Sequence, residues 1–418
     1  MIDQLAAAGV RRGELLAVVV APGTGVGLAV PGGPAWGIET GDPASLVGDL
    51  DEAIGPRWAM WSSATAEALV RGGTRVQRSW DAAAVHRLLY GGWRAEPGRI
   101  WARLHDLATS GLPTAGPADL FSFEAEPTGD GPVRGDGHLD PSWAAGEWKD
   151  DPSRFERWAG TLAEAVQLQR AALDRVAIAA DRPMAVRTAI AESTAELLCA
   201  ELAVDGLPMD RGAMEALVRG AVGPRPRTPQ EADELRRARD AEVLRHVPEG
   251  VVFDLRSPTQ VRSMLRMVGV EVPDTRAWRL EGLRDVHPLV DALLTWRKAE
   301  RIDTTFGYRW LDEHLGEDGR FRGAWSGSDG AAGRMTASAG LHNMPADLRG
   351  GVVAEPGHVF VRADLGQIEP RVLAAVSGDR ALAAATQADD LYAPVAAELG
   401  VPRAIAKVAV LGAMYGQT

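Results

Sequence analysis

Residues 402–418 read PRAIAKVAVLGAMYGQT, which predicts a helix with two cations in its first turns. At steps of four along this helix stand Arg403, Lys407, Leu411 and Tyr415. Four residues advance a helix by slightly more than one turn, so these side chains form one slowly rotating stripe. The residues around them are mostly Ala, Val, Leu and Met, which is typical of a packed helix whose few polar side chains line a site. The positive end of the helix dipole lies at this N-terminus, and no acid in the stretch balances the two cations. We therefore expect a bound anion there.

A second stretch, residues 358–376, reads HVFVRADLGQIEPRVLAAV. It predicts an apolar strand over residues 357–364, a turn at Gly366 and then a helix. Asp364 at the strand end can offer oxygen ligands to Mg²⁺, which prefers a few carboxylates together with substrate phosphates. Glu369 lies in the first helical turn, where it suits the dipole and also serves as an ordinary capping acid. Taken alone, the two acids are equally typical of a surface turn.

Together these stretches resemble the signatures of the family A DNA polymerases, the bacterial polymerase I type. In that family the first signature usually reads Asp-Tyr-Ser-Gln-Ile-Glu-Leu-Arg, and the second reads Arg-x3-Lys-x3-Phe-Gly-x2-Tyr-Gly. The resemblance covers roughly residues 190–418. Its segments follow the family's order and are LCAELAVDGLPMD (198–210), LLTWRKAERIDTTF (293–306), GRMTAS (333–338), LHNMP (341–345), DLGQIEPR (364–371) and RAIAKVAVLGAMYG (403–416).

The resemblance implies template-directed DNA synthesis, in which a primer 3′-hydroxyl attacks a dNTP with the help of two Mg²⁺ ions. It implies that Asp364 holds the catalytic metals and that Arg403 and Lys407 hold the triphosphate, which would be the expected anion. Glu369 would be a steric gate against a ribose 2′-hydroxyl, and Gln367 would support primer and template. Leu411 and Tyr415 would complete the substrate site, with Tyr415 near the templating base. The DNA-binding residues implied are Arg297, Arg301, Arg334, His342, Asn343 and Arg371.

Three departures from the family pattern affect these expectations. Leu411 stands where the family usually has an aromatic residue, and His342 replaces a usual glutamine. The third signature, a His-Asp-Glu tripeptide with the second metal-binding aspartate, has no counterpart in the chain. We therefore expect the sequence to be an incomplete fragment of a polymerase and inactive on its own.

The expected fold class is α+β with several domains. Before the polymerase region the family has an exonuclease-like domain of the RNase H type, and the order of strands and helices here is similar to it. Strands are predicted at 15–21, 25–31, 35–40 and 57–62, and helices at 43–55, 64–73 and 81–89. The predicted domains are an exonuclease-like α/β domain (1–124), a linker (125–149), a helical connector and thumb (150–310), a partial palm (311–378) and the start of the fingers (379–418).

The chemistry of a proofreading nuclease is missing from the N-terminal sequence. Such a site needs three or four carboxylates around two metals, beginning with Asp-x-Glu on the first strand, and LLAVVVA (15–21) has neither acid. Asp81 alone cannot bind two metals, and Arg94 follows Tyr90 where the family's third exonuclease motif has an acid. We expect a structural remnant without nuclease activity.

Composition sets the remaining limits. The chain has 418 residues with 46% hydrophobic residues, which suits a globular protein. Its net charge of −12 argues mildly against a simple polyanion binder, although a nucleic-acid enzyme needs only a local positive groove. No stretch is apolar enough to span a bilayer, so no membrane is expected as a partner. The single cysteine, Cys199, excludes an internal disulfide and a cysteine zinc site. We expect a cytoplasmic, nucleoid-associated protein whose partners are primer–template DNA and dNTPs; protein partners are not indicated.

Two other functions stay open at this stage. A single-subunit RNA polymerase shares a similar Arg-x3-Lys helix, although Glu369 as a bulky gate and Gly412 after Leu411 favour deoxynucleotides. The chain is also compatible with a non-catalytic nucleic-acid binder that has lost its polymerase. The charged helix predicted at 228–247 is interpreted as a solvated face or, less simply, as a contact with the DNA backbone.

Overall fold

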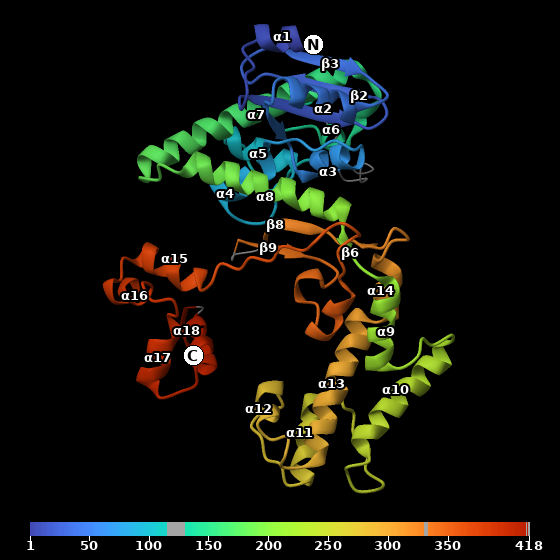
Figure 1. Cartoon of the computed structure of the whole chain (residues 1–418). Coiled ribbons are helices and arrows are strands. Elements are labelled where there is room, and N and C mark those ends of the chain that lie inside the picture. The colour runs from blue at the N-terminus through green and yellow to red at the C-terminus, as the bar shows by residue number, and fades with distance from the viewer. Residues whose placement is uncertain (115–129, 330–332, 415, 417–418) are drawn as a thin grey trace. The chain divides into compact units, whose positions relative to one another are not determined.

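The computed structural model describes residues 1–114, 130–329, 333–414 and 416 of the α+β, helix-rich chain (Figure 1). Contacts within the chain divide it into two units, Met1–Val353 and Ala354–Thr418. The first unit contains an N-terminal region, residues 1–179, and a helical region, residues 185–353. The finer domain boundaries expected from the sequence stay predictions.

A five-stranded sheet with the order β3-β2-β1-β4-β5 forms the centre of the N-terminal region. Strands β1, β2 and β3 pair antiparallel, whereas β4 and β5 run parallel to β1. The strands are β1 (Leu15–Ala21), β2 (Gly25–Ala29), β3 (Ala35–Glu39), β4 (Arg57–Met60) and β5 (Ser79–Asp81). The first four confirm the predicted strands. The three residues of β5 are too few to show a period, and the sequence did not predict them.

Both faces of this sheet are buried, which explains the continuous apolar run of β1. Leu16 and Val18 face a core with α2 and α3, whereas Ala17 and Val19 face a second core with α7. Side chains alternate between the two faces of a strand, so one run serves both cores. The helices of this region are α1 (Ile2–Ala7), α2 (Pro43–Ala53), α3 (Ser63–Arg71), α4 (Ala82–Tyr90), α5 (Pro97–Leu104), α6 (Pro141–Ala145), the 3-10 helix η1 (Glu147–Asp150) and α7 (Pro152–Ala179).

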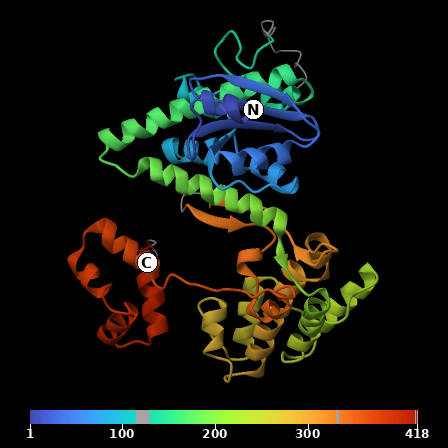
Figure 2. The ribbon, with the colours of Figure 1, turned by 45° about the horizontal axis from the view of Figure 1, so that its top comes forward.

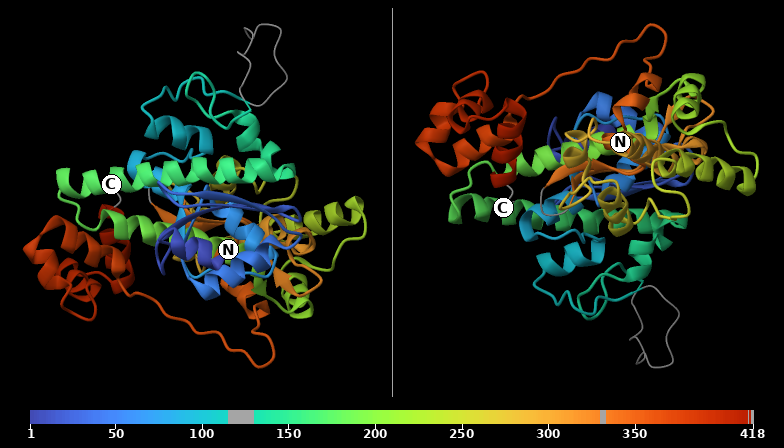
Figure 3. Two further views of the ribbon diagram at one scale, coloured as in Figure 1. Left: turned by 90° about the horizontal axis from the view of Figure 1, so that it is seen from above. Right: turned by 90° about the horizontal axis from the view of Figure 1, so that it is seen from below.

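Glycines let α7 lie very close to strands β2 and β3 (Figure 3). A Cβ on Gly27 would stand 2.2 Å from the carbonyl oxygen of Phe155, and one on Gly37 would stand 2.3 Å from that of Pro152. Neither backbone oxygen can move without moving the helix. Gly27 and Gly37 are therefore needed where the helix crosses the strands.

Part of the expected linker is built into this region. Asp140 accepts a hydrogen bond from the backbone nitrogen of Ser142 and begins α6, and Trp143 and Trp148 bury their rings in the core below α7. The expected linker residues 125–129 lie outside the described residues.

Two helices of the helical region begin at capping side chains. Asp210 and Ser257 accept hydrogen bonds from the backbone nitrogens of Ala213 and Gln260, and they begin α9 and α11. Residues 288–314 form two helices, because Gly307 takes an extended conformation between them. The helices are α8 (Ala185–Asp205), α9 (Arg211–Val222), α10 (Pro229–Leu244), α11 (Pro258–Met267), α12 (Ala277–Glu281), α13 (Pro288–Phe306) and α14 (Tyr308–His314).

Charged residues attach α10 to α13, and Val243 is the buried residue of α10. Asp240 accepts hydrogen bonds from Arg256 at 2.9 Å and from the indole nitrogen of Trp296 at 2.8 Å. Arg239 of α10 pairs with Asp303 of α13. One side of the helix predicted at 228–247 therefore packs against α13 through ion pairs, and the remainder is mostly exposed.

Short strands and 3-10 turns complete the first unit. Strand β6 pairs with β7, and β8 pairs antiparallel with β9. Their bounds are β6 (Leu207–Pro208), β7 (Arg320–Phe321), β8 (Trp325–Asp329), β9 (Arg334–Ala337), η3 (Leu341–Asn343) and η4 (Ala346–Gly351).

The second unit is helical. Its helices are α15 (Ile368–Ser377), α16 (Arg380–Ala385), α17 (Tyr392–Leu399) and α18 (Arg403–Met414). The strand predicted over 357–364 is wrong: these residues are not in a strand, and Val359 and Val361 are 82% and 90% exposed. An apolar run becomes a strand only beside a partner, and no described residue pairs with this one. Across the described residues, no helix combines the length and the apolarity that crossing a membrane requires.

Candidate nucleotide and nucleic-acid sites

Asp364 lies in the exposed turn that precedes α15, and its backbone oxygen accepts a hydrogen bond from the nitrogen of Gly366 at 3.1 Å. Glu369 follows in the first turn of α15 and is half-buried. Between them Gln367 has a φ of +58°, a left-handed conformation that few residues other than glycine adopt. The turn thus separates an exposed carboxylate from one placed at the positive end of a helix.

Gln367 and Arg371, both predicted to contact primer or DNA, hold a neighbouring loop of the second unit. The amide nitrogen of Gln367 donates to the carbonyl oxygen of Asp389 at 3.0 Å, and its oxygen accepts from the nitrogen of Leu391 at 2.7 Å. The Arg371 guanidinium donates to the carbonyl oxygens of Thr386 and Ala388. These bonds fix residues 386–391 against α15, and the predicted DNA contacts stay predictions.

Asp390, in this loop, pairs with Arg403. The guanidinium donates to both carboxylate oxygens, with Nη2 3.2 Å from Oδ1, and stacks 5.5 Å from the ring centre of Tyr392. The hydrogen bonds from Arg403 hold the pKa of Asp390 below its usual value. The sequence near Arg403 predicted a cation without a balancing acid, but in the fold Asp390, 13 residues upstream, balances its charge. No local pattern shows this pairing, because it depends on how α17 packs against α18.

Lys407 is exposed one turn after Arg403. Within the described part of the chain it has no hydrogen bond or ion pair, so its charge is available to an anion. Leu411 is half-buried on the same stripe. Tyr415 lies outside the described residues, so its predicted stacking role stays a prediction.

The described carboxylates provide at most part of a metal site. Among the described residues, no group of three or more His, Cys, Asp or Glu side chains could hold an ion. Asp364 by itself fits the role of one ligand to a Mg²⁺ that also binds substrate phosphates. It does not fit a complete site for two ions.

The predicted DNA-binding residues of the first unit fall into two places. Arg301 donates to the carbonyl oxygen of Asn343 at 3.2 Å, and His342 accepts from the nitrogen of Ala337 at the end of β9 at 3.3 Å. Strand β9 begins at Arg334, so the structure gathers these four predicted residues around β9 and η3. Arg297 instead donates to the carbonyl oxygen of Thr275, and burial lowers the pKa of its guanidinium.

The N-terminal region uses its candidate acid for structure. Asp81 is 4% exposed and caps α4 by accepting a hydrogen bond from the nitrogen of Ala84 at 2.7 Å. Burial raises the pKa of its carboxyl to about 7. Tyr90 packs near Arg103, and Arg94 pairs with Glu96.

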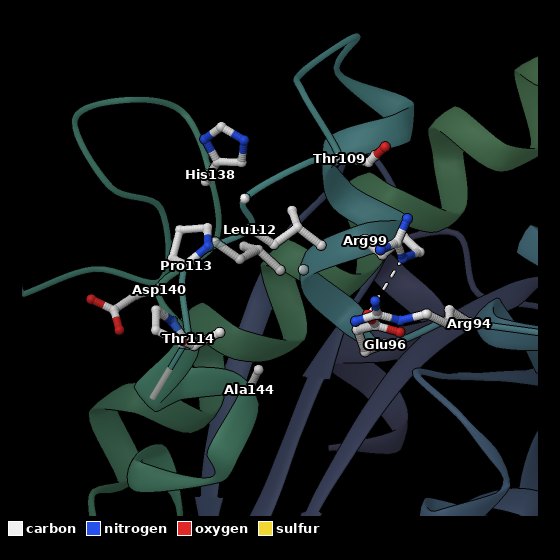
Figure 4. A pocket seen from close by; sticks show the side chains of 14 residues that line it. Arg94, Glu96, Arg99, Thr109, Leu112, Pro113, Thr114, His138, Asp140 and Ala144 are labelled. Atoms are coloured by element: carbon white, nitrogen blue, oxygen red, sulfur yellow. Dashed lines mark hydrogen bonds and ion pairs between the residues drawn. The ribbon is translucent and has the colours of Figure 1, made fainter. Parts of the chain in front are cut away.

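A cavity of about 390 Å³ lies beside α5 in the same region (Figure 4). Glu96, paired with Arg94 and Arg99, stands at one side, and His138 and Asp140 stand at the other. No residue predicted for polymerase chemistry lines it, so the cavity is separate from the candidate sites.

Comparisons with known proteins show similarities in the second half of the chain. Residues 229–418 match the family model described as DNA polymerase family A. The DNA polymerase I of Chloroflexus aurantiacus is 35% identical over 154 residues, which cover 33% of this chain and 16% of that protein. The thermostable DNA polymerase I of Thermus aquaticus is 32% identical over 161 residues, covering 34% of this chain and 19% of that protein. The matched stretch therefore spans less than a quarter of the length of either relative.

A solved structure shares the fold over nearly the whole chain. It is described as the POL domain of Pol1 from M. smegmatis in complex with DNA primer-template and dNTP. The alignment has a TM-score of 0.60 and 21% sequence identity, and it covers 99% of this chain and 70% of the other. At this identity the likeness shows the fold alone. The match over residues 229–418 adds a similarity to DNA polymerase family A for that part of the chain.

Proposed function

We propose that the chain is part of an enzyme for template-directed DNA synthesis, which transfers deoxynucleotidyl groups from dNTPs to a primer 3′-hydroxyl. One observation carries this proposal: the family match over residues 229–418 contains every residue that the sequence assigns to the polymerase chemistry. The neighbouring fold is that of a polymerase domain whose structure holds primer–template and dNTP, which supports the same partners here.

The finer architecture belongs to this proposal. Residues 150–310 would be the connector and thumb, 311–378 part of the palm and 379–418 the start of the fingers. The N-terminal sheet has three antiparallel strands followed by two parallel ones, an order that supports a domain of the RNase H type. Its first strand carries only Leu, Ala and Val, which supports a domain without nuclease chemistry.

The cations of α18 would bind the triphosphate at the helix N-terminus. Lys407 offers an exposed point charge, whereas Arg403 can donate two parallel hydrogen bonds to phosphate oxygens. Arg403 already makes such bonds to Asp390, so binding requires it to exchange a carboxylate for a phosphate. Asp390 would thus hold Arg403 in place before nucleotide binding and release it afterwards.

Asp364 would hold Mg²⁺ together with substrate phosphates. The bound ion supplies charge neutralisation at the reacting phosphoryl group, which is most of what phosphoryl transfer needs. Among the described residues, no group of three or more His, Cys, Asp or Glu side chains completes a two-ion site. We therefore expect the 418-residue chain alone to show no primer extension.

Nucleotide-dependent DNA binding by the 418-residue chain tests the proposal. Fluorescence anisotropy would follow the dissociation of labelled primer–template with the complementary dNTP, a mismatched dNTP or the complementary rNTP. We expect the complementary dNTP to slow dissociation most. Equal or greater slowing by the rNTP would favour an RNA polymerase. DNA binding that ignores every nucleotide would favour a non-catalytic nucleic-acid binder.

A further inference from the structure

Helix α8 connects the N-terminal sheet to the helical region through its buried face. Ser193 accepts a hydrogen bond at its hydroxyl oxygen from the backbone nitrogen of Asp81, and at its carbonyl oxygen from the hydroxyl of Ser79, both at 2.9 Å. Ser193 itself is fully buried. These bonds fix α8 along the edge strand β5.

One turn further along α8, Glu196 forms a buried ion pair with Arg87 of α4. The guanidinium nitrogen Nη2 lies 2.5 Å from the carboxylate oxygen Oε1, and the two side chains are 22% and 7% exposed. A charge at that depth keeps its position only while its partner stays, because an unpaired buried charge is strongly unfavourable. Arg87 therefore fixes where the Glu196 side chain lies.

Strand β8 packs against helix α8 (Figure 2). A Cβ added to Gly327 would stand 3.2 Å from both the carboxyl carbon and the backbone nitrogen of Glu196. Glycine is thus the residue that lets the strand lie directly on this acid. Asp329 of the same strand pairs in register with Arg334 of β9.

We propose that Glu196 is a positioning residue for DNA binding: held by Arg87, it sets the β8–β9 hairpin and hence Arg334 at the primer end. The inference rests on the proposed function, since Arg334 is a DNA contact only there. It gives the N-terminal region a role in polymerisation that needs no nuclease carboxylates. In that role, α4 and α8 provide the surface against which the β8–β9 hairpin packs.

A double-mutant cycle on the 418-residue chain separates positioning from general stabilisation. Anisotropy at fixed salt would give the Kd for labelled primer–template of the wild type, Arg87→Ala, Arg334→Ala and the double variant. We expect Arg87→Ala to raise the Kd between about twofold and thirtyfold. With Arg334 already removed, the same change should have much less effect. Arg297→Ala is the matched control, because Arg297, the predicted DNA contact away from β9 and η3, donates to the carbonyl oxygen of Thr275. Its effect on the Kd should multiply fully with that of Arg87→Ala.

Two further variants keep the test independent of folding. Arg87→Lys retains the charge and should recover part of the affinity. Gly327→Val presses on Glu196 without unpairing it and should weaken binding in the same Arg334-dependent way. The inference would be overturned if Arg87→Ala and Gly327→Val raised the Kd for DNA by the same factor with and without Arg334. The proposed function would then remain intact. A wild-type chain that does not bind DNA would overturn both.

Discussion

The close approach of α7 to the sheet makes a quantitative prediction for Gly27→Ala. The added Cβ would stand 2.2 Å from the carbonyl oxygen of Phe155 and 2.7 Å from its carbonyl carbon. Ordinary contact begins near 3.4 Å, so the helix has to move away by roughly 1 Å or the strand has to bend. Overpacking of this kind costs about 1–3 kcal/mol, and a backbone obstacle places Gly27→Ala at the upper end.

Gly160→Ala is the matched control, because it makes the same chemical change within α7 itself. Nothing lies within 4 Å of a Cβ at Gly160, so alanine should stabilise the helix by about 0.5–1 kcal/mol. Urea denaturation followed by tryptophan fluorescence reports on both variants, since Trp61 and Trp158 stack in the core under α7. Equal stabilities for wild type and Gly27→Ala, beside a stabilised Gly160→Ala, would refute the close packing of α7.

Three further predictions concern charge. Burial raises the pKa of Asp81 in the folded protein to about 7, from about 4 for a free carboxyl. The stability that Asp81 contributes is therefore present below pH about 4 and lost as pH rises to about 7. Urea denaturation at several pH values should show that the free energy of unfolding of the wild type, relative to Asp81→Asn, falls as the pH rises through this range. A difference that does not change with pH would contradict the raised pKa of Asp81. Comparing the two proteins also removes the opposite pH dependence of His86, whose pKa burial lowers to about 4. Asp390→Asn should tighten dNTP binding about two- to fivefold, because it frees Arg403 from its ion pair. Calorimetry on the DNA complex would measure this affinity. Weaker binding would instead mean that Asp390 holds the arginine in the position that binds the nucleotide. DNA affinity should fall linearly with the logarithm of salt concentration, and Arg301→Ala should reduce that slope by about 1; an unchanged slope would remove Arg301 from the phosphate contacts.

Local patterns were enough to predict much of the fold. The strand at 15–21 depends on neighbouring residues alone, and the structure confirms it. Strand 357–364 failed because pairing is not local: its valines are apolar but have no neighbouring strand among the described residues. The three-residue strand β5 was not predicted for a related reason, because it forms only by pairing with β4.

The candidate sites divide in the same way. The sequence singled out Lys407 on a predicted helix and Asp364 at the end of a predicted strand, and both are exposed although that strand does not form. It could not find Asp390 as the partner of Arg403, because 13 residues and a helix pair separate them. Nor could it place Gly327 on Glu196, since that contact joins segments 131 residues apart in the chain.

The nucleotide affinity of Lys407→Ala tests the central claim most directly. Calorimetry would measure binding of the complementary dNTP with Mg²⁺ to the complex of the 418-residue chain with primer–template, with Lys149→Ala as the control. Loss of a charged phosphate contact should weaken nucleotide binding by about tenfold or more, and the Kd for DNA should stay the same in both variants. Unchanged nucleotide affinity in Lys407→Ala, with weakened DNA binding instead, would contradict a triphosphate site on α18.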